Sequence, residues 1–312
     1  MAENGITLMA YGRGTPFPAD AAHVLDEARL AALKETDPDV RSRMFARIDG
    51  LRYGNSDLLL FSLGGQAVGL ISCEARDDDV QLAFGHVLRA HDEHKAAMFE
   101  MAVRHLEKRY RIVRSNFKWP EPGAFSAAAR AMGFAVVERM DMTRAVDAAH
   151  AVRQLPAGFG IVPYSSRYFE DVARLMCETS DPMDCVVLPL FSSVEGCRTL
   201  LGQMLAGAFG VFRPGLSFVA LDGGRLAGYM ITASYGEGVV HIDDIAVAPD
   251  FRGKGLASAM IDRLVRDGGI AGDRSVLLTV TTTNQDALRL YLHKGFTVKE
   301  AFRQHVYIPN GK

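Results

Sequence analysis

HIDDIAVAPDFRGKGLA, residues 241–257, is the stretch that decides the fold. Its first half alternates and is rich in branched residues, which predicts a strand, and Pro249 ends that strand because proline has no N–H to donate. Apolar residues at helical spacing follow and predict a helix. Gly253 and Gly255 lie in the turn between them, where glycine lets a ligand approach the backbone closely. Backbone N–H groups, a helix dipole and neighbouring basic residues together predict a phosphate-binding loop.

This loop is neither a Walker loop nor the dinucleotide-binding GxGxxG. Its pattern is Arg-x-x-Gly-x-Ala after a strand that ends in Ile-Ala-Val-x-Pro, and it resembles the coenzyme A diphosphate loop of the GNAT N-acyltransferases. The structural alternative is an ordinary glycine-rich connection. The resemblance implies that the coenzyme is held by Arg252, Gly253, Lys254, Gly255, Leu256 and Ala257.

Composition narrows the class of protein. The chain has 312 residues, of which 48% are hydrophobic and 23% charged, as in ordinary globular proteins, and its length favours two domains. A net charge of −2 gives no reason to expect a nucleic-acid partner. We see no signal peptide and no apolar run of membrane-spanning length, so we expect a cytoplasmic protein without a membrane partner. Four scattered cysteines predict no disulfide framework and no zinc site, and we expect no metal.

The sequence contains an internal duplication. GGQAVG at 64–69 corresponds to GGRLAG at 223–228, and Gly-Phe recurs at 133–134 and 295–296, so the period is about 160 residues. Each half has the order β-α-α-β-β-β-α-β-α-β. Hairpins require antiparallel pairing and crossover helices require a parallel pair, which together predict an α/β fold with a mixed sheet.

Both halves resemble the GNAT fold in this order of elements. We therefore expect a degenerate GNAT-like domain at 1–145, a linker at 146–158 and a catalytic GNAT domain at 159–312. In the first half, residues 92–97 take the place of the loop, but they contain no glycine and begin with Asp92 and Glu93. Carboxylates there would repel phosphates, and we expect them instead to cap a helix.

A second motif follows in the catalytic half. Residues 284–296 resemble the GNAT pattern N-x-x-A-x-x-x-Y-x-x-x-G-F, with Asn284, Ala287 and Tyr291 in the motif positions. The resemblance implies that Asn284 and Ala287 lie along the pantetheine arm and that Tyr291 gives a proton to the departing thiolate. The alternative is a tyrosine that only packs in the core.

Two adjacent aspartates, Asp243 and Asp244, lie within the predicted strand, where buried acids are unusual. Alternation would point them to opposite faces. In several GNAT enzymes a carboxylate here deprotonates the amine. We favour Asp243 but leave the choice between them open, with His241 a third candidate and solvated edge charges the structural alternative. The resemblance also implies that the strand backbone of Ile245, Ala246 and Val247 pairs with pantetheine and that an N–H group stabilises the oxyanion.

The sequence thus predicts an acetyl-CoA-dependent N-acetyltransferase that acts by direct attack in a ternary complex, with only the second domain active. The acceptor would be a primary amine of a small molecule or peptide, and segment 178–187 is expected to line its side of the cleft. A homodimer is an open alternative to a monomer. The rival functions are a non-catalytic acyl-CoA-binding or regulatory module and an acyltransferase with another acceptor.

Overall fold

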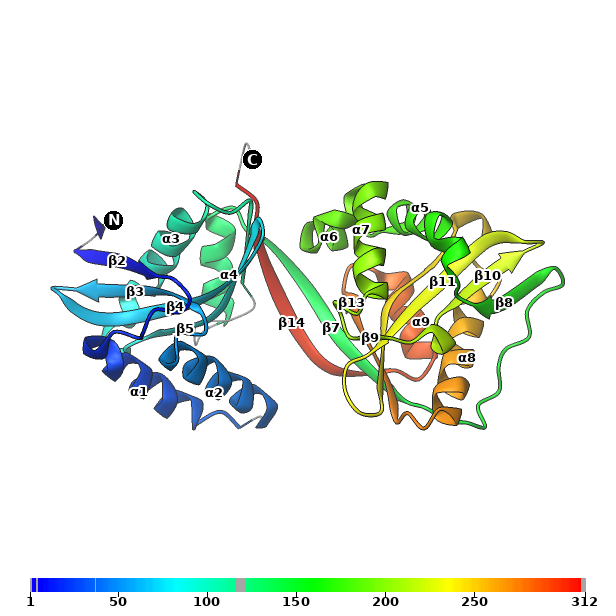
Figure 1. Cartoon of the computed structure of the whole chain (residues 1–312), viewed down its shortest axis with the longest axis horizontal. Coiled ribbons are helices and arrows are strands. Elements are labelled where there is room, and N and C mark those ends of the chain that lie inside the picture. Colours follow the sequence, from blue (N-terminus) through cyan, green and yellow to red (C-terminus); the bar gives the residue numbers. More distant parts are fainter. Residues whose placement is uncertain (1, 4, 37, 116–121, 310–312) are drawn as a thin grey trace. The chain divides into compact units, whose positions relative to one another are not determined.

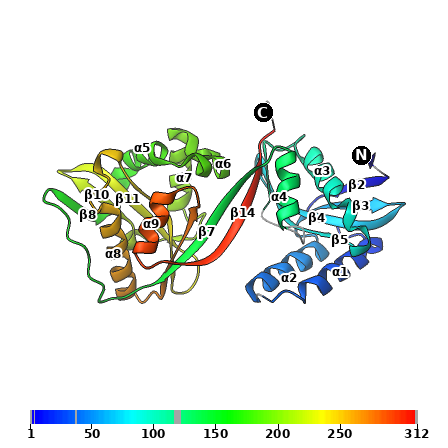
Figure 2. The same ribbon diagram turned by 180° about the vertical axis from the view of Figure 1, so that it is seen from behind.

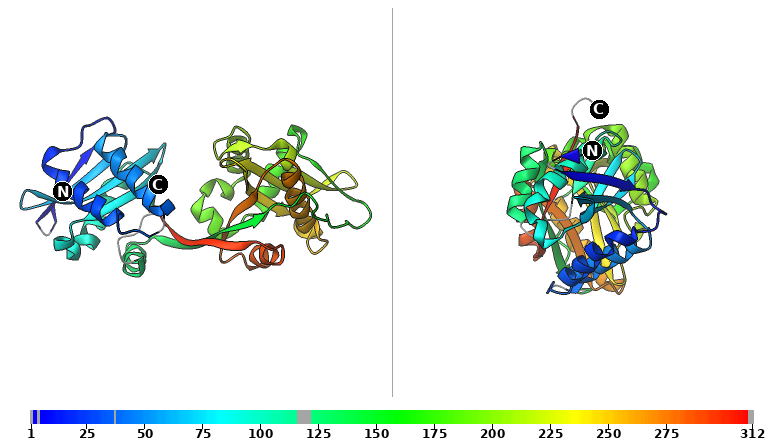
Figure 3. Two further views of the ribbon diagram at one scale, coloured as in Figure 1. Left: turned by 90° about the horizontal axis from the view of Figure 1, so that it is seen from below. Right: turned by 90° about the vertical axis from the view of Figure 1, so that its left-hand side faces the viewer.

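The computed structural model describes residues 2–3, 5–36, 38–115 and 122–309 (Figure 1). The chain divides into two compact units. Unit 1 is Met1–Val136 together with Arg303–Lys312, and unit 2 is Val137–Phe302. Helices lie on both sides of a sheet in each unit, as the views in Figure 3 show.

Unit 1 is built on a mixed sheet in the order β1-β2-β3-β4-β5-β6-β14. Among the described strand pairs of this sheet, β5–β6 alone is parallel, and β14 closes the sheet antiparallel to β6. The strands are β1 (Ala2–Glu3), β2 (Ile6–Tyr11), β3 (Asp57–Leu63), β4 (Gln66–Arg76), β5 (Asp79–Val87), β6 (Ile112–Ser115) and β14 (Thr297–Tyr307). The helices are η1 (Ala19–Ala21), α1 (Ala22–Ala32), α2 (Pro38–Arg52), η2 (Arg89–His94), α3 (Lys95–Leu106) and α4 (Pro122–Ala131).

Alternation along the strands gives the sheet of unit 1 two apolar faces. Leu58 and Leu60 of β3 pack with α1 and α2, whereas Leu59 and Phe61 pack with α3. Burial of both faces explains why β3 is a nearly continuous apolar run.

Unit 2 repeats this plan in the sheet order β7-β13-β12-β11-β10-β8, with short β9 pairing β11. Its strands are β7 (Ala135–Ala145), β8 (Phe159–Pro163), β9 (Val211–Phe212), β10 (Phe218–Asp222), β11 (Arg225–Ser234), β12 (Val239–Val247) and β13 (Ser275–Thr281). Its helices are η3 (Ser166–Tyr168), α5 (Phe169–Thr179), α6 (Pro182–Val187), η4 (Pro189–Ser192), α7 (Val194–Leu205), η5 (Pro214–Leu216), η6 (Pro249–Phe251), α8 (Leu256–Ile270) and α9 (Gln285–His293).

The core of unit 2 also has two layers. Tyr229 and Ile231 of β11 face α5 and α7, and Met230 faces α8. Figure 2 shows α8 and α9 together on one side of the sheet. The loop after β12 therefore opens onto the α8 side of the sheet.

Matching irregularities in the two units support the duplication. The hairpins β3–β4 and β10–β11 each carry a register shift, at Phe61/Ser62 and at Ala220/Leu221. A second shift occurs in β4–β5 at Ser72/Cys73 and in β11–β12 at Ile231/Thr232. Two chain segments with the same bulges at the same steps have the same backbone plan.

The two halves of the sequence exchange their last strands. β7, from the first half, pairs antiparallel with β13 from Ser275↔Ala145 to Thr281↔Arg139. The end of β14, from the second half, pairs with β6 through His305↔Ser115. The division expected at residue 145 therefore differs from the observed units, because strand pairing assigns most of β7 to unit 2 and the end of β14 to unit 1.

Two further features of the fold concern the cysteines and the length of the helices. All four cysteines are free thiols, with Cys73 and Cys197 buried and the other two partly exposed. Among the described residues, no helix combines the length and the apolar character needed to cross a bilayer.

Candidate functional site

The loop between β12 and α8 has the backbone that its glycines predict. Gly253 and Gly255 have φ values of +75° and +82°, in the left-handed region that other residues avoid. Gly255 is the N-cap of α8, and no side chain in the described part of the chain caps this end. Ala259 N donates to Gly255 O at 3.0 Å as the helix begins. The first N–H groups of a helix lack intrahelical acceptors, so they are available to an anion.

Strands β12 and β13 separate next to this loop. Their parallel pairing ends at Ile242↔Leu278, although β12 continues to Val247. The other edge of β12 stays paired with β11 as far as Gly228↔Val247. Within the residues that the structure describes, the backbone from 243 to 247 therefore has no strand neighbour on the β13 side and can pair with an extended ligand.

A cavity of about 610 Å³ joins the loop to the separated strands. This volume lies within the range typical of small-molecule sites. The cavity is lined by Arg153, Thr179, Asp181, Ile245, Ala246, Val247, Phe251, Arg252, Gly253, Gly255, Leu256, Ala257, Ser258, Asn284, Asp286, Ala287, Leu290 and Tyr291. Every residue that the sequence assigned to coenzyme binding is in this set except Lys254. The ammonium of Lys254 lies instead over the rings of Phe159 and Phe251, at 5.3 and 4.9 Å.

Segment 146–158, expected to be a linker, is an irregular strap along α8. Asp147 N donates to Val265 O at 3.1 Å. The buried Asp262 of α8 accepts from Lys294 Nζ at 2.8 Å and contacts His150 Nε2 at 3.0 Å. Burial alone would raise the pKa of the Asp262 carboxyl, but the Lys294 and His150 contacts hold it below the usual value. The strap passes beside the cavity, where it adds a lining residue that sequence reasoning missed, Arg153.

Helix α9 places the second motif at the same cavity. Asn284 is its N-cap, and the Asn284 side chain accepts from Ala287 N at 3.2 Å. Tyr291, two turns along, is 7% exposed and packs against Phe296. Burial and then the charges of Asp244 and Asp184 raise the pKa of the Tyr291 hydroxyl, which therefore stays protonated at neutral pH. Tyr291 is thus both a core residue and a lining residue.

The paired aspartates lie at a β-bulge, which sequence reasoning did not foresee. Ile231 pairs with Asp244 and Thr232 with Ile242, so Asp243 is the extra residue. Ile242 and Ile245 consequently pack in the same cluster on the α8 side, and simple alternation does not hold across the pair. Among the described residues, the cavity lining includes neither aspartate.

Asp243 is engaged with His241. Its Oδ1 lies 2.8 Å from His241 Nδ1, and its side chain is 3% exposed. Its Oδ2 is buried and, within the part of the chain that the structure describes, has no hydrogen-bond partner. Burial raises the pKa of the Asp243 carboxyl, and His241 opposes that rise.

Asp244 accepts two hydrogen bonds, and its charge acts on Tyr291, the proposed acid. Its Oδ2 accepts from Tyr229 Oη at 2.5 Å, and its Oδ1 accepts from Ile245 N at 2.9 Å. Burial raises the pKa of Asp244 to about 6 despite these two bonds. The charge of Asp184 on α6 raises the pKa values of both Asp244 and Tyr291, so these three groups share one electrostatic environment.

Asp184 was not identified from the sequence, although its segment was expected at the acceptor side. Thr281 donates its hydroxyl to Asp184 Oδ1 at 2.5 Å, and Arg139 of β7 lies 3.7 Å from the same oxygen. These contacts fasten α6 to β13 and β7. Thr179 and Asp181, just before α6, line the cavity. No sequence signal pointed to Asp184, because its role depends on strand exchange.

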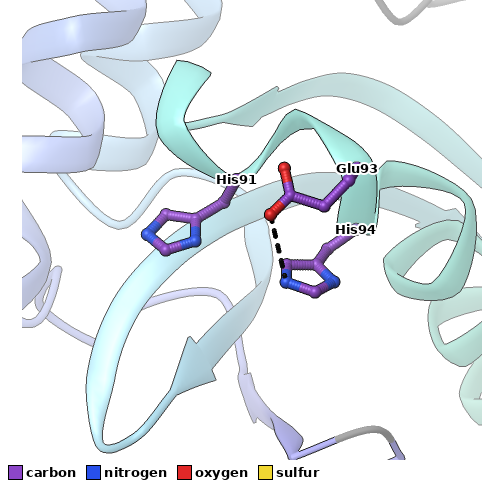
Figure 4. Close-up of side chains that lie close together, drawn as sticks. All are labelled: His91, Glu93 and His94. Atoms are coloured by element: carbon purple, nitrogen blue, oxygen red, sulfur yellow. Dashed lines mark ion pairs between the residues drawn. The ribbon is translucent and has the colours of Figure 1, made fainter.

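The counterpart region in unit 1 has different chemistry. Asp92 and Glu93 do not cap a helix as expected, because α3 begins at Lys95 and, among the described residues, has no side-chain cap. Asp92 instead pairs with Lys95 at 2.7 Å. In Figure 4 the Glu93 carboxylate lies between the rings of His91 and His94, 3.6 Å from His94 Nε2. Ligand atoms of these three residues lie within 4.8 Å of one another, and such a donor set could hold a transition metal.

Residues 200–296 match the model of the Acetyltransferase (GNAT) family. An uncharacterized N-acetyltransferase of Methanocaldococcus jannaschii is 37% identical over 65 residues, which span 21% of this chain and 29% of that protein.

Two solved structures are similar along nearly the whole chain. A GCN5-related N-acetyltransferase from Sphaerobacter thermophilus has a TM-score of 0.58 at 19% identity, over 98% of this chain and 96% of that one. A tandem GNAT protein from the clavulanic acid biosynthesis pathway has a TM-score of 0.52 at 16% identity, over 97% and 98% of the two chains. At these identities the likeness concerns the fold, and that fold is the expected pair of GNAT units.

Proposed function

We propose, on the premise that residues 200–296 match the GNAT acetyltransferase family, that the protein is an acetyl-CoA-dependent N-acetyltransferase with its active site in unit 2. One observation carries the proposal. The uncapped start of α8 and the separated edge of β12 line a single cavity of about 610 Å³, which suits a ligand with a phosphate end and an extended arm.

The residues present fit acetyl-CoA. The glycine loop and Arg252 would hold the diphosphate, and the β12 backbone from Ile245 to Val247 would pair with the pantetheine arm. Bound acetyl-CoA supplies an activated acetyl group and a thiolate leaving group. An N–H group of the β12 edge would bind the oxygen on which negative charge develops.

We assign the role of base to Asp244. Its raised pKa of about 6 leaves the carboxylate ionised at neutral pH and makes it a stronger base than an exposed aspartate. Because Asp244 is set back from the cavity surface, it would take the amine proton through a water molecule. Asp243 is the alternative base, but its Oδ1 is already held by His241.

Tyr291 would supply the proton that the departing sulfur needs. Its raised pKa keeps the phenol protonated until negative charge develops on the sulfur. The acceptor in this proposal is a primary amine of a small molecule or a peptide. The Asp244 carboxylate, which is ionised at neutral pH and raises the pKa of Tyr291, favours a cationic acceptor. Cytoplasmic location, a monomer or homodimer, and the absence of nucleic-acid, membrane and metal partners remain predictions.

Two measurements on the purified protein test the proposal. Acetyl-CoA should raise the melting temperature, because a ligand that binds only the native state stabilises it. A set of amines should then release free thiol from acetyl-CoA. No thermal shift at millimolar acetyl-CoA would refute the coenzyme site. A shift without thiol release from any amine would favour the acyl-CoA-binding or regulatory module instead.

A further inference from the structure

Arg153 lies directly against the phosphate loop, although about 100 residues separate the two in sequence. It lines the cavity. A Cβ atom built on Gly255 would lie 3.0 Å from Arg153 Nε and 3.3 Å from its Cζ, so the guanidinium occupies the space that the glycine leaves. Within the described residues, this guanidinium makes no hydrogen bond or ion pair, and the side chain is exposed.

The position of Arg153 is set by its backbone. Arg153 N donates to Asp262 Oδ2 at 3.4 Å, and the same buried carboxylate holds His150 and Lys294. Leu155, two residues on, packs against the core of unit 2. The strap is thus held by contacts on both sides of Arg153. These contacts place the Arg153 side chain beside the loop.

The cavity lining contains both acidic and basic side chains, and Arg153 is one of the basic ones. Asp181 and Asp286 are lining residues, and both are acidic. Lys254 directs its ammonium to two aromatic rings. Arg252 and Arg153 are therefore the basic side chains in the lining as the structure describes it. The Asp286 carboxylate is already paired with Arg289 at 2.5 Å, so both arginines can serve a ligand with several negative charges.

We propose that Arg153 binds a phosphate group of the coenzyme, an inference that rests on the proposed function of the same site. The guanidinium fork can donate two parallel N–H bonds to phosphate oxygens, which an ammonium cannot do. The chemistry is that of a phosphate oxyanion, and coenzyme A offers two sources of it, the diphosphate and the 3′-phosphate. The strap between the two halves would then be part of the coenzyme site.

Calorimetric titration of the full chain distinguishes these sources. The dissociation constants of acetyl-CoA and of 3′-dephospho-acetyl-CoA would be measured for wild type, Arg153→Ala and Arg153→Lys. We expect Arg153→Ala to bind acetyl-CoA about tenfold more weakly and Arg153→Lys to recover part of that loss. An equal loss with both compounds identifies the diphosphate as the partner, and a loss with acetyl-CoA alone identifies the 3′-phosphate.

Arg225→Ala is the matched control. Arg225 is also an exposed arginine near the loop, with its guanidinium over Phe251 and 3.6 Å from Asp250, but it is not a lining residue. Its removal should leave both dissociation constants unchanged. Equal acetyl-CoA affinity in wild type and in an Arg153→Ala protein of unchanged melting temperature would overturn the inference alone. A wild type that binds neither compound would overturn the proposed function and this inference with it.

Discussion

Replacement of Tyr229 by phenylalanine should move the acid side of the pH–rate profile upward. Tyr229 is fully buried and donates its hydroxyl to Asp244 Oδ2 at 2.5 Å. That bond stabilises the ionised carboxylate and so lowers the pKa of Asp244, against the larger opposite effect of burial. Phenylalanine has nearly the same shape, so it should keep the packing while it removes the bond.

The size of the shift follows from this single bond. A hydrogen bond to a charged group contributes about 1.5–3 kcal/mol, and one pKa unit corresponds to about 1.4 kcal/mol, so the pKa of Asp244 should rise by about 1–2 units. From its value of about 6, it would reach about 7–8. At pH 7 the ionised fraction of the base would fall from about nine-tenths to between about a half and a tenth, and turnover with it.

Turnover would be recorded from pH 5 to pH 9 by thiol release, with both substrates saturating. The ionisations of the substrates are common to both enzymes, so the displacement between their profiles reports on the protein. Tyr235→Phe is the control, because Tyr235 contacts His241 and senses Asp243 rather than Asp244. Coincident profiles for wild type and Tyr229→Phe would refute Asp244 as the base, and a displacement in Tyr235→Phe alone would favour Asp243.

Three further outcomes are expected. Tyr291→Phe should lower kcat by at least about tenfold with little change in KM for acetyl-CoA, and unchanged turnover would exclude the tyrosine as the acid. Gly255→Ala should raise KM for acetyl-CoA and lower the melting temperature, because φ of +82° costs alanine about 1–2 kcal/mol; a neutral result would contradict the role of this turn. Asp244→Asn should stabilise the fold above pH 6 but not below pH 4. The native pKa of about 6 exceeds the ordinary 3.8, so the stability that the protonated carboxyl contributes at low pH is lost as pH rises through 6, by up to about 3 kcal/mol. Thermal unfolding of wild type and Asp244→Asn at pH 4 and pH 8 measures the effect of the substitution on stability. The same effect at both pH values would show that the charged carboxylate does not destabilise the fold.

Local rules account for the part of the site that the sequence predicted. Gly253 and Gly255 favour positive φ wherever they occur in a turn, and Pro249 ends a strand through its own missing N–H. Helical spacing of seven likewise brings Asn284 and Tyr291 to one cavity. Each of these inferences depends on residues within about two helical turns of one another.

The rest depends on tertiary context. A bulge at Asp243 changes no residue type, so alternation gave the wrong geometry for the aspartate pair. Arg153 lies in an irregular segment without periodicity, and tertiary contacts of that segment, among them the backbone bond from Arg153 to Asp262, bring it to the loop. The exchange of β7 and β14 was not predicted, because the residues of a strand indicate that it is a strand but not which sheet it joins.

The exchanged strands also affect the order in which the two units can fold while the chain is synthesised on the ribosome. The sheet of unit 1 needs residues 303–307 for its last pairing, and these emerge only after all of unit 2 has been synthesised. Unit 2 does not have this delay, because β7, the strand that it takes from the first half, is synthesised before the rest of the unit. During synthesis the sheet of unit 1 therefore keeps an unpaired edge, whereas unit 2 can complete its sheet first. This reverses the usual order, in which the amino-terminal domain folds first.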